Sequence, residues 1–160
     1  MIDTNNFLTK TGVRTFEAAA FLRRCGADVT RVRKMFREHV EDYRAKGEAI
    51  RNAELFREHF AISVCPSEGL DSPTVVGAQA ANELLNIIGG KASFVLTDYR
   101  NTIYISARSI DEINVQIVME RLGGGGHLNI AGAQLEHYSI TEAKDVLKQT
   151  LQKMLDEGDI

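Results

Sequence analysis

The sequence lacks tryptophan and is poor in proline, cysteine and long apolar runs. Its two cysteines, Cys25 and Cys65, match no metal-binding or redox spacing, which favours reduced thiols in a cytosolic setting. No apolar run approaches the roughly 20 residues that span a bilayer, and no signal peptide opens the chain. We therefore expect this stretch of chain to be soluble.

An excess of positive charge is also missing. Nineteen Lys and Arg residues stand against 22 Asp and Glu residues, which gives a net charge of −3. Without a global positive field the chain is not expected to hold long nucleic acid, so any polyanion must be bound locally. What is present is 160 residues, 44% of them hydrophobic, enough for a real core in one ordinary domain or two small ones.

The first part of the chain has helical patterns. Residues 13–25 are rich in Ala, Phe and Leu and stop at Gly26, which predicts a short and largely buried helix. Over residues 30–58 apolar positions recur at steps of four and three, which predicts a long helix that connects two lobes. Its narrow buried stripe would consist of Phe36, Val40, Tyr43, Gly47 and Ile50. We place the domain boundary after this helix, between residues 1–59 and residues 60–160.

The second part alternates short β and α patterns. The order predicted is strand, helix, hairpin, helix, strand and helix. The expected strands are 60–65, 93–98, 102–108 and 132–138, with helices at 74–88, before the glycine run (capped by Ser109 or Asp111) and after Ser139. A mixed β-sheet packed with helices, an α/β fold, satisfies this order.

The second strand of the expected hairpin should have two different faces. Alternation turns Ile103, Ile105 and Ala107 toward the core. Tyr104, Ser106 and Arg108 then lie on the other, open face.

The most informative motif is the run Gly123, Gly124, Gly125 and Gly126, followed by His127. Four residues without a Cβ let the backbone bring several N–H groups to one anion, and the histidine adds a side-chain donor. A linker or a helix C-cap would also use glycine. Apolar residues flank the run closely, however, so it belongs to a packed domain and we interpret it as a phosphate cradle. For His127, a buried structural histidine is the alternative.

Other polar residues are weaker candidates. Arg108 and the adjoining Ser109 end a strand, and a guanidinium binds phosphate through two parallel hydrogen bonds, although an ordinary surface arginine is the alternative. Asn114 is explained nearly as well as a polar residue in the first turn of a helix. Asp3 leaves a strand-like start and could ligate a divalent ion, but an Asx turn competes and no acidic or histidine cluster accompanies it.

These residues carry a family resemblance that covers practically the whole chain. The motifs are ISARS at 105–109, NVQ at 114–116, GGGGH at 123–127 and AGAQL at 131–135. They resemble the C-terminal substrate-binding domain of DHH-family phosphoesterases. IDTNNF at 2–7, TGVRTFEAA at 11–19 and GAD at 26–28 are similar to the end of the catalytic domain in the GdpP-type branch, the membrane-bound cyclic di-AMP phosphodiesterases of bacteria.

The resemblance implies a division of labour. Such enzymes bind manganese through Asp and His residues of the catalytic domain and open cyclic di-AMP to the linear dinucleotide pApA, and a two-metal mechanism suits a phosphodiester. Asp3 matches the last metal-binding aspartate, while Arg108 and Gly123 to His127 match the substrate-binding face. Asp-x-Asp and Asp-His-His motifs are absent here. We therefore expect a fragment with negligible hydrolysis of its own, taken from a membrane-anchored, homodimeric parent whose activity needs the intact chain.

Two other functions remain open at this point. A related enzyme that trims short oligoribonucleotides or dephosphorylates bisphosphorylated nucleotides would use the same cradle for a terminal phosphate. A non-catalytic nucleotide or RNA-binding module is the third possibility, since similar glycine-rich domains accompany tRNA synthetases. The acidity of the chain disfavours extended RNA, and the match around Asp3 favours the phosphodiesterase.

Overall fold

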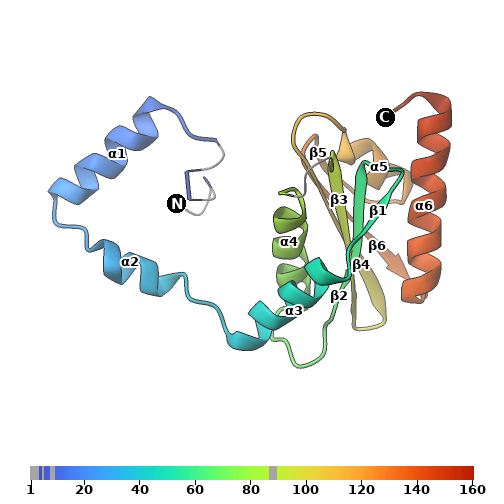
Figure 1. Cartoon of the computed structure of the whole chain (residues 1–160), viewed down its shortest axis with the longest axis horizontal. Coiled ribbons are helices and arrows are strands. Elements are labelled where there is room, and N and C mark those ends of the chain that lie inside the picture. The colour runs from blue at the N-terminus through green and yellow to red at the C-terminus, as the bar shows by residue number, and fades with distance from the viewer. Residues whose placement is uncertain (1–3, 5, 8–9, 87–89) are drawn as a thin grey trace. The chain divides into compact units, whose positions relative to one another are not determined.

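The computed structural model describes residues 4, 6–7, 10–86 and 90–160, which fall into two compact units, Met1–Glu38 and His39–Ile160. None of the described helices is both long and apolar enough to cross a bilayer. The elements are α1 (Val13–Arg24), α2 (Val29–Met35), α3 (Val40–Arg51), β1 (Glu54–Phe56), β2 (Phe60–Cys65), α4 (Pro73–Leu84), β3 (Ala92–Tyr99), β4 (Thr102–Ser109), α5 (Val115–Arg121), β5 (Gly125–His127), β6 (Ile130–Glu136) and α6 (Ile140–Glu157) (Figure 1). The predicted domain boundary, between residues 1–59 and residues 60–160, refers to the domains of a longer protein. It stays a prediction.

The first unit holds α1 and α2, and neither helix has a buried residue. The prediction of a helix over residues 13–25 is confirmed, but the expected burial is wrong. Phe16, Phe21 and Leu22 are each more than half exposed, at 56%, 58% and 58%. Two short helices offer too little surface to cover one another's apolar side chains.

The long helix expected over residues 30–58 is instead two helices, α2 and α3, followed by the short strand β1. The charges on either side of the break suit two separate helix ends. The last turn of α2 carries Arg33 and Lys34, while the first turn of α3 carries Glu41 and Asp42. Each set is favourable with the dipole of its own helix end.

The expected stripe on this segment is also wrong. Val40 and Tyr43 are exposed, whereas the buried residues of α3 are Ala45 and Ala49. Small side chains let α3 approach β2 closely, and the Ser63 hydroxyl donates a hydrogen bond of 2.5 Å to the Ala49 carbonyl. The bulkier apolar residues are therefore not the ones that anchor this helix.

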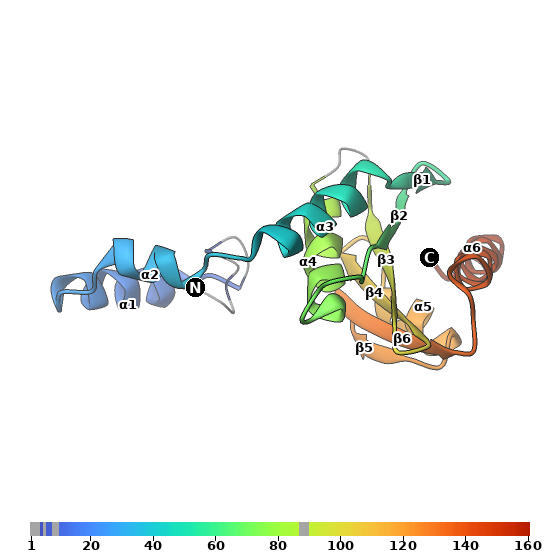
Figure 2. The same ribbon diagram turned by 90° about the horizontal axis from the view of Figure 1, so that it is seen from below.

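The second unit is built on a six-stranded sheet in the order β1-β2-β3-β4-β6-β5 within the described residues. Only the β2–β3 pair is parallel, which confirms the mixed sheet of an α/β fold. Helices α3 and α4 cover one face and α5 and α6 the other (Figure 2). The larger part of the core lies under α5 and α6, where Phe60, Phe94, Leu147 and Met154 are fully buried.

The predicted hairpin between β3 and β4 is confirmed. Its two loop residues, Arg100 and Asn101, both have positive φ, 53° and 63°, as a tight turn between twisted strands requires. Ile103, Ile105 and Ala107 are buried, at 0%, 2% and 0% exposure. The opposite face of β4, which carries Tyr104, Ser106 and Arg108, is therefore the more accessible one.

Some boundaries differ from the expected ones. Helix α4 ends at Leu84 rather than at 88, and residues 87–89 lie outside the described part of the chain. The cap of α5 is Asn114, not Ser109 or Asp111, because its Oδ1 accepts a hydrogen bond from the Gln116 N–H at 3.1 Å. Strand β6 ends at Glu136, since His137 has a positive φ of 64°.

The glycine run is a helix end followed by an edge strand, not an open loop. Gly123 has φ +78° and closes α5, with its N–H bonded to the Glu120 carbonyl at 3.0 Å. The Gly124 N–H is bonded to the Met119 carbonyl at 2.8 Å. Gly125 to His127 then pair with β6 as β5.

Two of these glycines are required by close packing of β5 on β6. A Cβ on Gly124 would lie 2.1 Å from the Gly132 oxygen, and one on Gly126 would lie 2.5 Å from the Ile130 oxygen. Gly126 also has φ +148°. Gly125 differs, because a Cβ there would meet nothing within 4 Å.

The two kinds of glycine should respond differently to substitution. We expect Gly124→Ala to lower the free energy of unfolding by about 3 kcal/mol, because the methyl meets backbone that cannot yield easily. Gly125→Ala should leave it unchanged or raise it by up to about 1 kcal/mol. Urea unfolding followed by circular dichroism measures both. Equal losses for the two variants would contradict the packing described for β5.

Candidate functional site

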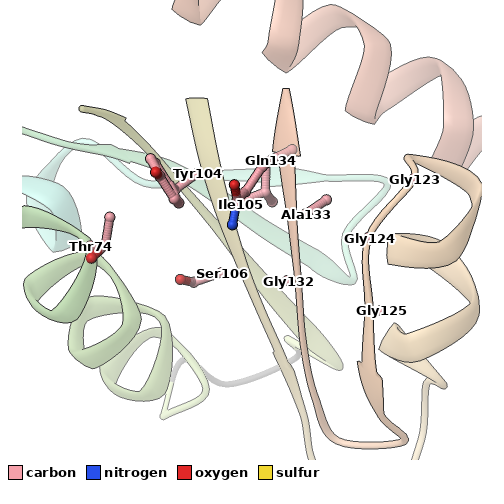
Figure 3. Close-up of a pocket in the computed structure, with 10 residues that line it drawn as sticks. All are labelled: Thr74, Tyr104, Ile105, Ser106, Gly123, Gly124, Gly125, Gly132, Ala133 and Gln134. Atoms are coloured by element: carbon pink, nitrogen blue, oxygen red, sulfur yellow. The ribbon is translucent and has the colours of Figure 1, made fainter. Parts of the chain in front are cut away.

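An open hollow of about 560 Å³ lies on the α4 face of the sheet. Helix α4 packs over β2, β3 and β4, and beyond it β6 and β5 form the outer part of this face. The hollow lies there, lined by Thr74 of α4 and by residues of β4, β6 and the glycine run (Figure 3). The accessible face predicted for β4 is thus part of a concave surface.

Strand register arranges the residues of this surface in three rows. Paired residues of neighbouring strands point to the same face of a sheet. From one end to the other, the rows are Tyr104 with Gln134; Ser106 with Gly132 and Gly125; and Arg108 with Ile130 and His127. The middle row consists of small residues, so it forms a floor between two rows of larger side chains.

Arg108 is held firmly in its row. Its Nε–H donates to the Asn82 Oδ1 of α4 at 2.9 Å, and Nη1 donates to the Ala107 carbonyl at 2.8 Å. Helix α4 is itself fixed beside Asn82, because the Ser93 hydroxyl donates to the Ala81 carbonyl at 2.6 Å. Burial lowers the pKa of the guanidinium, yet arginine stays protonated at neutral pH. Within the described residues Nη2 has no hydrogen-bond partner, so both of its N–H groups remain available to an anion.

His127 lies in the same row as Arg108 and on the same face of the sheet. Two strand spacings separate them, roughly 10 Å between backbones, with Ile130 between them. The imidazole is exposed rather than buried, so the structural-histidine alternative is wrong. The two side chains therefore lie on the same face of the sheet, in the row next to the hollow.

The remaining candidates have other positions. Ser109 points to the opposite face from Arg108, is 5% exposed, and its hydroxyl contacts Asn129 Oδ1 at 3.3 Å, which supports the β5–β6 turn. Asn114 caps α5. The amides of Gly123 and Gly124 are bonded to carbonyls of α5, so they are not available to a ligand in this structure. Gly123 and Gly125 both line the hollow and both have room for a Cβ, but Gly123 has φ +78°, so Gly125 is the one that also tolerates a side chain in its backbone conformation.

No metal centre is formed by the described residues. Asp3 lies outside them. Among the residues that the structure does describe, no three His, Cys, Asp or Glu side chains come together in a way that could hold an ion. The Cys65 thiol is buried, and this burial raises its pKa to about 11, which makes it inert as a nucleophile or ligand.

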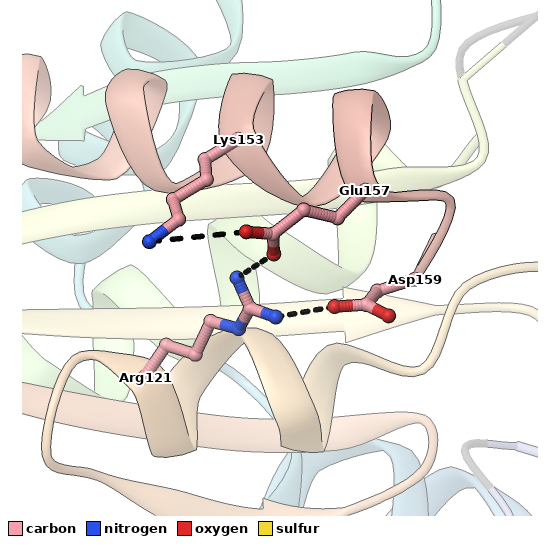
Figure 4. A network of polar contacts seen from close by, with 4 residues as sticks. All are labelled: Arg121, Lys153, Glu157 and Asp159. Atoms are coloured by element: carbon pink, nitrogen blue, oxygen red, sulfur yellow. Dashed lines mark hydrogen bonds and ion pairs between the residues drawn. The ribbon is translucent and has the colours of Figure 1, made fainter.

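A network of ion pairs fixes the helix end from which the glycine run starts. Arg121, the last residue of α5, pairs with Glu157 at 2.7 Å and with Asp159, while Lys153 lies 3.8 Å from Glu157 (Figure 4). The hydrogen bond from Arg121 lowers the pKa of the Glu157 carboxyl. These charges satisfy one another, so they serve to join α5 to α6 rather than to bind a ligand.

Sequence reasoning missed part of this surface. Gln134 and Thr74 were not expected in a site, and Asn82 was not expected to hold Arg108. Alternation along residues 132–138 could have placed Gln134 on the face of Tyr104 only if the pairing of β4 with β6 had been known. The contact between Asn82 and Arg108 spans 26 residues and has no signature in the local sequence.

Comparison with known proteins identifies the family and the fold. The cyclic-di-AMP phosphodiesterase PdeA of Listeria monocytogenes is 40% identical over 92% of this chain, and GdpP of Bacillus subtilis is 40% identical over 99%. The chain spans 22% and 24% of the length of these relatives. An exopolyphosphatase-related protein from Bacteroides fragilis has the same fold, with a TM-score of 0.84 at 22% identity over 96% of this chain and 47% of that one.

The family assignment rests on the second unit. The DHHA1 domain matches residues 59–154, which include β2 to β6, the glycine run and nearly all of α6. The resemblance to DHH-family phosphodiesterases is therefore confirmed, and the chain belongs to the DHHA1 domain family.

Proposed function

We propose that this chain is the substrate-binding part of a phosphodiesterase that hydrolyses cyclic di-AMP to linear pApA. The observation that carries the proposal is that Arg108, Gly125 and His127 share one face of the sheet, where Gly125 lines the hollow and the row of Arg108 and His127 lies next to it. An oxyanion bound there would contact the fixed guanidinium of Arg108 and the backbone of Gly125, where no side chain blocks its approach. The chemistry named for the relatives, cyclic di-AMP hydrolysis, supports the choice of ligand.

In this proposal phosphate is bound by nearby groups and not attracted by the overall charge of the chain. The chain as a whole carries a net charge of −3, so long-range attraction does not gather anions. Arg108 supplies one positive charge, and its two bonds to α4 and to its own strand hold that charge in place before a ligand arrives. A preordered donor avoids the entropy that a mobile arginine would lose on binding.

Hydrolysis belongs in this proposal to an intact parent. The described residues do not form a metal site, so the two-metal chemistry would be supplied by other residues, with Asp3 as the candidate ligand from this chain and manganese as the candidate ion. We further propose that the parent is anchored in the cell membrane, that this part is cytoplasmic, and that the parent is a homodimer. The chain alone should then bind the nucleotide without cleaving it.

Arg108→Ala should weaken the binding of cyclic di-AMP at least tenfold, because it removes a charge-assisted hydrogen bond. Isothermal titration of the chain with cyclic di-AMP, pApA and a control trinucleotide measures this. Arg44→Ala is the matched control, since Arg44 is an exposed arginine of α3 that pairs with Glu41. Unchanged affinity in Arg108→Ala, or tightest binding of a longer RNA, would sink the proposal.

Gly125→Ala separates folding from binding. The methyl has room in the free protein, but it would stand where the ligand approaches the backbone, so we expect affinity for cyclic di-AMP to fall about fivefold or more. The melting temperature should not fall. Gly47→Ala, at an exposed glycine of α3 that also has nothing within 4 Å, is the control and should leave affinity unchanged. Full affinity in Gly125→Ala would show that no ligand contacts this backbone.

A further inference from the structure

The row of Tyr104 and Gln134 lines the hollow two rows away from Arg108 and carries polar side chains that the proposed phosphate binding does not use. Tyr104 and Gln134 are paired across β4 and β6, and Figure 3 shows them at the same end of the hollow. Neither the Gln134 amide nor the Tyr104 hydroxyl has a hydrogen-bond partner among the described residues. The Tyr104 ring lies 6.4 Å from the ring of Tyr99, which supports it from the side.

From this arrangement we infer that Gln134 recognises the adenine base of the bound dinucleotide, beside the ring of Tyr104. The inference rests on the proposed function, because a phosphate bound at Arg108 would set the orientation of the nucleotide on this surface. Four residues of β4 separate the row of Arg108 from that of Tyr104, roughly 13 Å along the strand. The small floor of Ser106 and Gly132 lies between them and leaves space for a sugar.

The chemistry of an amide favours adenine over guanine. Adenine presents an acceptor, N7, next to a donor, the N6 amino group, and a glutamine amide matches both with its NH₂ and its oxygen. Guanine presents two acceptors, N7 and O6, so the amide oxygen would face another oxygen. An aromatic ring next to the amide adds stacking that any base can use. Specificity would therefore come from Gln134 and general base affinity from Tyr104.

The competing explanation is that Gln134 is an ordinary exposed residue on an outward position of β6. To separate the two, cyclic di-AMP, cyclic di-GMP and the 7-deaza analogue of cyclic di-AMP are titrated against the chain and Gln134→Leu. Gln149→Leu, at an exposed glutamine of α6, is the matched control. Thermal melts check that each variant is folded.

We expect the unsubstituted chain to prefer cyclic di-AMP over cyclic di-GMP by about tenfold and to lose about tenfold for the 7-deaza analogue. Gln134→Leu should reduce both ratios to less than about threefold, and Gln149→Leu should keep them. Arg108→Ala should weaken all three ligands by the same factor. Gln134→Leu should bind the 7-deaza analogue about as tightly as it binds cyclic di-AMP. The two losses of affinity do not add, because removing N7 and removing the amide break the same hydrogen bond.

Contrary results would distinguish the two proposals. If cyclic di-AMP binds and depends on Arg108, but Gln134→Leu keeps the preference or weakens all ligands equally, the base assignment is wrong and the phosphate site stands. Equal affinity of the unsubstituted chain for both dinucleotides also overturns the base assignment alone. If neither dinucleotide binds, or Arg108→Ala has no effect, the proposed function fails and the base assignment fails with it.

Discussion

The close packing of β5 against β6 is the constraint on which the site depends. It is possible only because Gly124 and Gly126 have no side chain, since a Cβ at either would overlap the backbone of β6. Pairing in this register turns Gly125 and His127 to the face on which β4 presents Arg108. Gly124 and Gly126 thus act as packing residues, and the candidate ligand surface depends on where this packing places the edge strand.

The other side of the site is organised through α4. Ser93 bonds to the carbonyl of Ala81, and the next residue, Asn82, accepts from Arg108. Gly77 lets the helix approach the sheet, because a Cβ there would lie 2.3 Å from the Thr97 hydroxyl. The guanidinium of Arg108 is in this way held at one place, in a chain whose net charge is −3.

Much of the fold could be predicted from the sequence, and the reasons are local. Alternation along residues 102–108 identified the buried and open faces of β4, and the spacing of Ser139 and Glu142 identified the cap of α6. The predictions that failed concerned strand pairing or the residues at which helices begin and end. The long helix was expected from apolar spacing, yet α2 ends at Met35 and α3 begins at Val40. The candidate site was only partly predictable, because the role of Asn82, the position of Gln134 and the strand formed by Gly125 to His127 all require the order β4-β6-β5.

We propose that one surface, formed by β4, β6 and β5 beside α4, binds a dinucleotide phosphate. Following the backbone amide signals of the chain by NMR during titration with cyclic di-AMP tests this most directly. The largest shifts should fall on Gly125, Gly132 and Gln134 and on the side-chain signal of Arg108. Shifts concentrated on the arginines of α2, or on the Arg121 end of α5 and α6, would contradict it.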